Sequence, residues 1–252
     1  MDDPTVTFDR LTDLGAESPV LIEGFPGFGL VAAIAVEQIT TQLGLEHHGN
    51  IVSEAFPPVL TYRDGHAHDL VRVYADGSHG VMTLKSDLAL PPSTFEPLSR
   101  CVHEQLAEEF DRAIFLAGAP ARNEGEVGNV RAVVTDDAVA ADVQDAGIEL
   151  ADGAGAIGGI TGALANDCYR FDVPAVVLVV HADPYFPDPG AAQSLIEDAL
   201  EPLVAFDIDT TELAEQSNRI QQQMEQIAEQ YRQMLEGAYR EQQPDTVMTG
   251  IQ

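Results

Sequence analysis

The sequence predicts a three-layer α/β/α fold with a mostly parallel sheet, followed by a C-terminal coiled-coil helix. Short continuous apolar runs, which suit strands buried on both faces, alternate with longer segments of helical character. Two glycine-rich turns each open an apolar helix, and a heptad pattern begins after Thr211. We therefore expect an α/β domain over residues 1–208, a coiled-coil helix over 209–240 and a flexible tail over 241–252.

The first strand, turn and helix are expected within the sequence PVLIEGFPGFGLVAAIAV, residues 19–36. We expect a buried strand at Val20–Ile22 and a helix at Gly29–Leu43. The glycines permit a sharp turn or a close approach, and Pro26 fixes one φ angle. Either the turn is a tight packing connection, or it contacts a ligand or partner. Its G-x-x-G-x-G spacing matches neither a dinucleotide-binding fingerprint nor a phosphate-binding P-loop.

Short strand-like runs separated by turn residues fill residues 47–85, and they predict hairpins added to the sheet. These runs are Ile51–Phe56, Val59–Arg63, Asp69–Ala75 and Gly80–Lys85. A helix is expected next, at Ser93–Phe110, with Ser93 as its N-cap and Glu96 completing a capping box.

The second half continues the alternation of strands and helices. The expected strands are Ala113–Ala117, Val130–Thr135, Ile148–Leu150 and Ala175–Val180. The expected helices are Asp136–Asp145, a helix opened by the glycine-rich residues 153–164, and Ala191–Leu203. Asp188 followed by Pro189 fits an N-cap and a first helical position. Right-handed crossovers would place helices on both faces of the sheet.

Loops after parallel strands meet at one edge of a sheet, so four segments should converge there. They are Gly24–Gly29, Gly118–Gly128, Gly153–Gly162 and His181–Pro189. The candidate ligand- or partner-contacting residues in them are Gly24, Pro26, Gly27, Gly29, Arg122, Glu124, Gly158, Gly159, His181 and Asp183. His181 with Asp183 can act as acid and base, and Arg122 with Glu124 can bind a polar ligand. Each pair also fits an ordinary strand end or solvated loop.

No catalytic constellation emerges from the sequence. A Gly-x-Ser-x-Gly elbow is absent. His66 and His68 can share a strand face, but we find no further metal ligands to accompany them. Cys101 and Cys168 lack metal-site spacing and are expected to be reduced and packed. We expect neither a metal nor a cofactor.

A heptad seam follows Thr211. Leu213, Ile220, Ile227 and Met234 recur every seven residues, and four residues after each come Ser217, Met224, Tyr231 and Ala238. Four heptads suffice for a coiled coil, so Leu213, Ile220, Met224, Ile227, Tyr231 and Met234 are candidates for an oligomer or partner helix. The alternative is a long helix folded back on its own domain.

The charge balance is extreme, with 42 acidic against 12 basic residues and a formal net charge of −30. The acidic residues are spread along the whole chain, and Lys85 is its single lysine. Such a surface argues against nucleic-acid binding, which needs a basic footprint. It suits a cytoplasm at high salt, where charge repulsion is screened, so we expect a halophilic, archaeal source. No apolar run reaches the length of a membrane span, and we expect a soluble cytoplasmic protein without membrane contact.

Five motifs together resemble the archaeal branch of the proteasome assembly chaperone 2 family: PVLIEGFPGFGLVAAIAVEQI, ALPPSTFEPLSR, FLAGAPAR, GAIGGITGAL and PDPGAAQSLIEDAL. The resemblance covers about residues 18–205. It implies an α/β/α domain related to purine nucleoside phosphorylases without a demonstrated active site. It also implies homo-oligomers, often trimers, and for some members a role in assembling proteasome α-subunits. The last residues, Gly250-Ile251-Gln252, lack the penultimate tyrosine through which some of these factors dock.

Two functional hypotheses lead, and a purely structural oligomer with no dedicated ligand is a third possibility. The leading hypothesis is a non-enzymatic, oligomeric, chaperone-like protein that binds proteasome subunits. It rests on the resemblance, the heptad seam and the missing catalytic constellation. The alternative is a nucleoside- or carboxylate-handling enzyme, in which Gly24–Gly29 and Gly158–Gly162 would cradle an anion.

The dispersed negative charge predicts a salt-dependent stability. The thermal midpoint should rise between dilute buffer and molar KCl, because the Debye length falls to about 3 Å and acidic side chains cease to repel one another. Calorimetry across a KCl series measures this. A midpoint that stays constant over that series would contradict the expectation.

Overall fold

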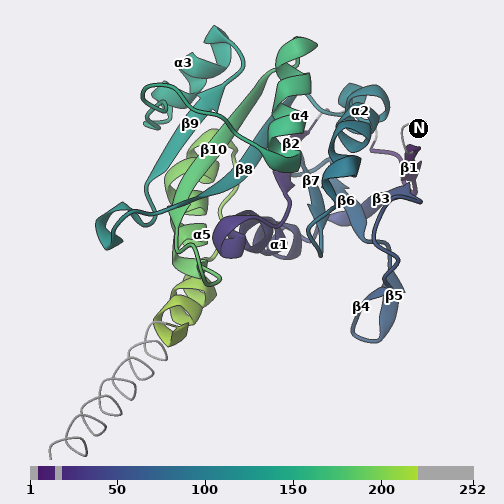
Figure 1. Cartoon of the computed structure of the whole chain (residues 1–252), viewed down its shortest axis with the longest axis horizontal. Helices are drawn as coiled ribbons and strands as arrows, with labels where there is room; N and C mark the ends of the chain where they lie inside the picture. Colours follow the sequence, from purple (N-terminus) through teal and green to yellow (C-terminus); the bar gives the residue numbers. More distant parts are fainter. Residues whose placement is uncertain (1–4, 15–18, 221–252) are drawn as a thin grey trace, which may run out of the picture.

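The computed structural model describes residues 5–14 and 19–220 of the chain, and it forms an α/β/α sandwich (Figure 1). The strands are β1 Val6–Arg10, β2 Val20–Gly24, β3 Glu46–Ser53, β4 Thr61–Arg63, β5 His66–His68, β6 Val71–Asp76, β7 Val81–Ser86, β8 Arg112–Pro120, β9 Val130–Val134 and β10 Ala175–Ala182. The helices are α1 Val31–Gln42, α2 Phe95–Gln105, α3 Asp137–Asp145, α4 Gly159–Arg170, α5 Pro189–Leu195 and α6 Glu201–Leu203.

Eight strands form one sheet in the order β1-β3-β6-β7-β2-β8-β10-β9. Its four central strands, β7, β2, β8 and β10, run parallel to one another. The remaining pairings, of β1 with β3, β3 with β6, β6 with β7 and β9 with β10, are antiparallel. The expectation of a mostly parallel sheet is therefore wrong, and the sheet is mixed. The hairpin β4–β5 stands outside the main sheet as a separate pair.

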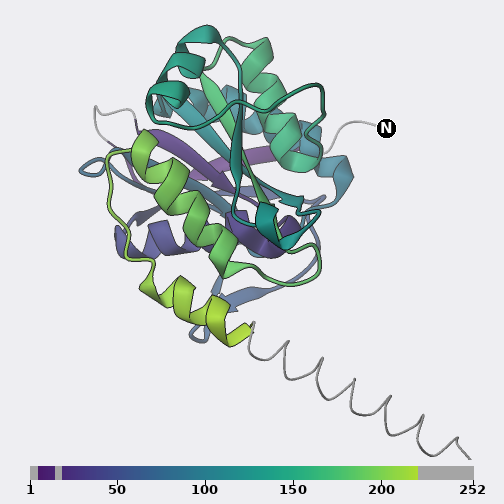
Figure 2. The same ribbon diagram turned by 90° about the vertical axis from the view of Figure 1, so that its left-hand side faces the viewer.

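The two faces of the sheet carry separate apolar cores. Helices α1, α3 and α5 pack on one face, around Ile22, Ile114 and Leu178. Helices α2 and α4 cover the other, around Leu21 and Phe115. Side chains alternate along a strand, which is why neighbours in β2 and β8 enter opposite cores. Figure 2 shows α5 and α1 on one side of the sheet and α4 on the other. The predicted three-layer architecture is confirmed.

Several local predictions need correction. Helix α2 is shorter than expected, since a 3₁₀ turn at Pro92–Thr94 precedes it and another at Ala107–Glu109 follows. Ser93 lies inside the first of these turns and is not the N-cap. The expected strand at Ile148–Leu150 reduces to a single bridge between Ala132 and Leu150.

The helix after β10 begins as predicted. Asp188 Oδ1 accepts a hydrogen bond from the Ala191 N–H at 2.9 Å, and Pro189 occupies the first turn. The helix then widens into a π-helical turn at Ile196–Leu200 before α6.

Cys101 and Cys168 are free and buried, as expected. Burial raises the pKa of each thiol to about 12, so neither is a ready nucleophile.

The chain after the domain returns to its own core. Residues 211–220 are helical, and Leu213 is buried in the core beside α1 and α5. Asp209 holds this segment to α1, because its N–H donates to Gln42 Oε1 at 2.9 Å and its carbonyl accepts from Gln42 Nε2 at 2.6 Å. Leu213 thus packs within its own domain rather than facing a partner. Ile220 ends the described part half-buried, and Met224, Ile227, Tyr231 and Met234 lie outside the described residues.

Two glycines allow the chain to approach the carboxyl edge of the sheet closely. A Cβ at Gly24 would lie 2.5 Å from Val36 Cγ2 and 2.6 Å from the Ala32 carbonyl of α1. A Cβ at Gly118 would collide with the carbonyl of Phe28. Glycine at these positions sets the distance between the β2–α1 connection and the sheet.

We predict that Gly24→Ala lowers the free energy of unfolding by about 2 kcal/mol or more, because the new methyl group overlaps α1. Gly27→Ala is the matched control, since a Cβ there meets nothing within 4 Å and its backbone is extended. Urea unfolding of both variants measures the difference. Equal stabilities would show that close helix packing is not what Gly24 provides.

Candidate functional site

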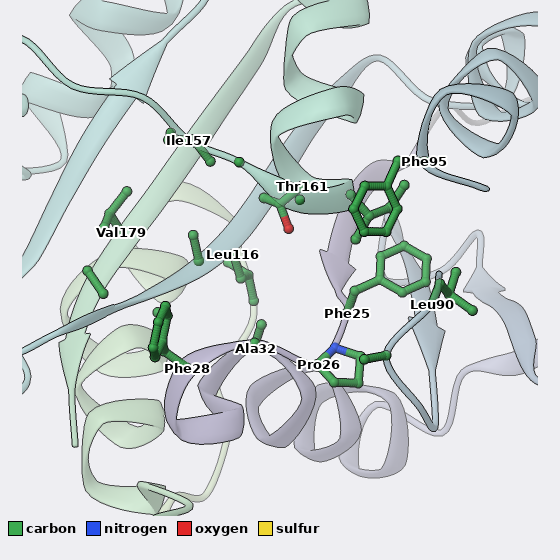
Figure 3. Close-up of a pocket in the computed structure, with 18 of the residues that line it drawn as sticks. Phe25, Pro26, Phe28, Ala32, Leu90, Phe95, Leu116, Ile157, Thr161 and Val179 are labelled. Atoms are coloured by element: carbon green, nitrogen blue, oxygen red, sulfur yellow. The ribbon is translucent and has the colours of Figure 1, made fainter. Parts of the chain in front are cut away.

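The loops after the central strands meet at one edge of the sheet and enclose a pocket of about 490 Å³ (Figure 3). The β2–α1 connection, the end of β8 and the segment leading into α4 form its walls. Its lining residues are Phe25, Pro26, Gly27, Phe28, Ala32, Ala89, Leu90, Phe95, Leu116, Ala117, Gly118, Ala119, Pro120, Ala156, Ile157, Gly158, Gly159, Ile160, Thr161 and Val179. Parallel strands end here together, which is where α/β folds place their ligand sites.

The pocket is almost entirely apolar. Phe25, Phe95 and Leu90 gather on one side, and Phe28, Leu116 and Val179 lie around the other (Figure 3). Among the lining residues, Thr161 supplies the one polar side chain, and its hydroxyl points into the space between them (Figure 3). No basic side chain belongs to the lining. The walls therefore suit an apolar group better than a phosphate.

A buried acid lies next to this pocket. Glu23, near the end of β2, is fully buried on the face that α2 and α4 cover. Its Oε1 accepts hydrogen bonds from the Phe25 N–H at 2.7 Å and from the Thr161 hydroxyl at 3.3 Å. Both donors belong to pocket-lining residues. The other oxygen, Oε2, has no hydrogen-bond partner among the described residues.

Burial raises the pKa of Glu23 to about 8, because the charged form loses its hydration. Hydrogen bonds from the Phe25 N–H and the Thr161 hydroxyl offset this only in part. Near neutral pH the side chain is mainly a carboxylic acid, and it ties the β2–α1 connection to the first turn of α4.

An exposed surface adjoins the pocket. Phe28, Leu30, Pro184, Tyr185, Phe186 and Pro187 form it, together with Gly27 and Gly29, around a shallow hollow of about 490 Å³. We call these residues the aromatic loop surface. Tyr185 is 85% exposed and Phe28 is 52% exposed. Clusters of exposed apolar side chains are typical of surfaces that contact a partner.

Carboxylates order the β10–α5 loop beneath this surface. Asp183 Oδ1 accepts from the N–H groups of Tyr185 and Phe186, at 2.7 and 3.0 Å. Asp188 Oδ2 accepts from the Asp183 N–H at 2.9 Å, and the Asp188 N–H donates to the Gly29 carbonyl at 2.8 Å. The two loops are thus held together by backbone contacts that do not involve the exposed rings.

The predicted site residues divide into two groups. Pro26, Gly27, Gly158 and Gly159 line the pocket, and Gly29 belongs to the aromatic loop surface. Gly24 lies at the end of β2 and packs against α1.

The polar candidates His181, Asp183 and Arg122 do not join them in the pocket lining. His181 lies beside Asn129, whose carbonyl is 3.3 Å from its Nδ1, while Asp183 is engaged with its own loop. Arg122 is exposed, and its N–H donates to Glu126 Oε2 at 2.9 Å. The backbone at Glu124 opens a short 3₁₀ turn.

Sequence reasoning missed Glu23, Thr161 and the aromatic residues Phe25 and Phe95. One signal for Glu23 was present, since a glutamate directly after Val20-Leu21-Ile22 is unusual in a strand buried on both faces. The partnership with Thr161 joins residues 138 positions apart, which no local pattern reveals.

A second polar cluster anchors the β4–β5 hairpin. Glu37 on α1 forms ion pairs with Lys85 and Arg63, and these outweigh burial and lower the pKa of its carboxyl group. Arg72, nearly fully buried, donates to Asp87 Oδ1 at 2.8 Å and contacts His68. His68 is thus part of this polar cluster.

Within residues 5–14 and 19–220, no group of three or more His, Cys, Asp or Glu side chains is placed to hold a metal ion.

Comparison with known proteins identifies the chain's relatives. Residues 21–228 match the PAC2 family. This chain belongs to the PAC2 family. The match includes the glycine-rich β2–α1 connection, the pocket and the aromatic loop surface, so these are parts of a PAC2 domain.

Solved structures share the fold. The PAC2 domain is similar to PbaA of Pyrococcus furiosus, an archaeal homologue of a proteasome-assembly chaperone, with a TM-score of 0.81, 22% identity and coverage of 94% of this chain and 97% of that one. It is also similar to PbaB of the same organism, an archaeal proteasome activator, with a TM-score of 0.77, 19% identity and coverage of 89% and 99%. An uncharacterised protein of Methanocaldococcus jannaschii is 25% identical over 225 residues, which cover 89% of this chain and 92% of the relative.

Within the described residues, no helix of this PAC2 protein is long and apolar enough to cross a membrane.

The buried acid predicts a pH-dependent stability. Between its ordinary pKa of 4.5 and its folded pKa of about 8, Glu23 keeps a proton in the native state that the unfolded chain releases. Its contribution to stability is therefore complete below pH 4.5, and it is lost as the pH rises through about 8. Relative to Glu23→Gln, the wild type should lose on the order of 3 kcal/mol between pH 5 and pH 8.

Urea unfolding of both proteins at the two pH values measures this. The glutamine keeps the shape of the side chain and its acceptor for the Phe25 N–H, and it removes the titration. Identical pH dependence of the two proteins would mean that Glu23 ionises in the folded state as it does in water.

Proposed function

We propose that this PAC2 protein is a non-enzymatic, chaperone-like protein that binds proteasome subunits. Support comes from its family and from its likeness in fold to PbaA and PbaB, whose names connect them to proteasome assembly and activation. The observation that carries the proposal is the aromatic loop surface.

The aromatic loop surface has the chemistry of a protein interface. Tyrosine, phenylalanine and arginine are enriched in interface cores, and a few such side chains provide most of the binding free energy. Here Tyr185, Phe186 and Phe28 are exposed on loops whose backbone is already ordered by Asp183 and Asp188. A preordered loop loses little conformational entropy on binding. The surface is thus prepared for a partner rather than for a reaction.

The candidate residues for chemistry support the same proposal. Arg122, His181 and Asp183 lie outside the pocket lining, and the lining has one polar side chain, Thr161. A nucleoside- or carboxylate-handling enzyme would need acid, base or cationic groups facing its substrate. No specific feature of the pocket favours that alternative.

A homo-oligomer is part of the proposal. Because Leu213 packs in its own domain, the partner-facing part of the heptad seam would begin after it. The exposed Val59 and Leu60, just before β4, and Tyr62, within β4, offer a second apolar contact. Sedimentation equilibrium of the full chain in KCl measures the subunit number, and a monomer at all concentrations would contradict this part.

The aromatic loop surface predicts a selective loss of binding. The double variant Tyr185→Ser with Phe186→Ser should weaken binding to purified proteasome α-subunits by about tenfold or more, since it removes two exposed anchor rings. The loop itself should keep its geometry, because Asp183 binds the backbone N–H groups of these residues and not their rings. Surface plasmon resonance with immobilised α-subunits measures the change.

Tyr169→Ser provides the matched control. Tyr169 is 66% exposed on α4 and lines neither the pocket nor the aromatic loop surface. If the double variant and Tyr169→Ser bind α-subunits with equal affinity, whether weak or strong, the contact lies elsewhere. A wild-type protein that fails to bind α-subunits at all would overturn the proposed function itself.

A further inference from the structure

The pocket behind the aromatic loop surface has features that a protein-docking surface does not need. It is a concave space of about 490 Å³ whose walls are apolar except at one end. At that end lie Thr161, the first turn of α4 and, adjoining them, the buried Glu23. A predominantly apolar cavity with a few converging polar groups is the usual form of a small-molecule site.

The polar end offers both a donor and an acceptor to a ligand. Thr161 donates its own proton to Glu23, so the lone pairs of its hydroxyl oxygen remain to accept a hydrogen bond from the pocket. The first N–H groups of an α-helix lack intrahelical acceptors, and the N-cap Gly158 has no side chain to receive them. Gly158, Gly159 and Ile160 all belong to the lining, so the first turn of α4 forms part of the pocket wall.

Glu23 is a second, independent observation that points to a binding role for the polar end of the pocket. A fully buried carboxyl group is costly, and buried polar atoms normally have at least one hydrogen-bond partner. Its Oε2 nevertheless has no partner among the described residues, while Oε1 holds Phe25 and Thr161 in position. The acid accepts the hydrogen bond of the Thr161 hydroxyl through Oε1, and its Oε2 stays buried and unpaired within the described residues.

We propose that this pocket binds a small neutral molecule with an aromatic or branched aliphatic body and a carboxamide head. The amide N–H donates to Thr161 Oγ1, and the amide carbonyl accepts from the first-turn N–H groups of α4. The body packs among Phe25, Phe95 and Leu116. This inference goes beyond the proposed function and does not rest on it.

The walls discriminate by charge. No basic side chain lines the pocket to neutralise a carboxylate or phosphate, and the chain has a net charge of −30. No carboxylate lines it either, so an ammonium group would meet no counter-ion in the pocket wall. A neutral amide brings neither an unpaired negative charge nor an unpaired positive charge into the pocket. The same chemistry belongs to a free carboxamide and to the terminal amide of a short apolar peptide.

Titration of the full-length protein with a matched set of probes tests this. The set is benzamide, benzoate and benzylamine, which share a ring and differ in the charge of the head, with N-acetyl-phenylalaninamide to represent a peptide source. Saturation-transfer NMR should give millimolar dissociation constants for benzamide, with benzoate and benzylamine at least about tenfold weaker. Tighter binding of the peptide amide than of benzamide assigns the ligand to a peptide, and the reverse assigns it to a free amide.

Two variants locate the binding. Gly158→Leu places a side chain on the pocket wall where a Cβ meets nothing within 4 Å, and it should abolish benzamide binding. Gly155→Leu is the matched control, because that glycine is equally unobstructed but does not line the pocket. Thr161→Val keeps the shape of the side chain and removes the acceptor, so it should weaken binding by about tenfold.

The proposal is overturned by any of three results: benzoate or benzylamine binds as well as benzamide, Gly158→Leu and Gly155→Leu bind benzamide equally, or the wild type binds none of the amides. Binding of α-subunits measured on the same Gly158→Leu sample separates this inference from the proposed function, because the aromatic loop surface is unchanged in that variant.

Discussion

The close approach of the β2–α1 connection to the carboxyl edge of the sheet is the constraint on which the site depends. Gly24 lets α1 lie against the end of β2, and Gly118 lets the carbonyl of Phe28 pass over β8. The connection therefore turns within a few residues, with Phe25 on the pocket side and Phe28 between the pocket and the aromatic loop surface. Both surfaces result from one glycine-permitted path of the backbone.

The parts of the fold that sequence could predict were those encoded locally. Apolar runs located β2, β8 and β10, and Asp188 with Pro189 located the start of α5, since buried strands and helix caps each depend on a few adjacent residues. The direction in which β9 pairs with β10 is not encoded in this way, so the mixed sheet was mistaken for a mostly parallel one. The edge strand β1 was missed for a similar reason, because its contacts come from β3.

The candidate site was predictable only in outline. Its glycine-rich walls follow from backbone geometry, and Pro26, Gly27, Gly158 and Gly159 do line the pocket. The polar candidates His181, Asp183 and Arg122 lie outside the pocket lining, whereas the buried Glu23, which adjoins it, does not stand out in composition. Its role appears only when β2 and α4 are brought together, through a hydrogen bond between residues far apart in the chain.

The cluster that anchors the β4–β5 hairpin also decides how the protein surface responds to lysine-directed chemistry. Lys85 is the one lysine of the chain, it is 7% exposed, and its ammonium group pairs with Glu37. Acylating reagents, amine-reactive cross-linkers and enzymes that form isopeptide bonds therefore find no exposed lysine on this protein. Its partners can be labelled or conjugated through their own lysines in its presence while it stays unmodified at that residue type.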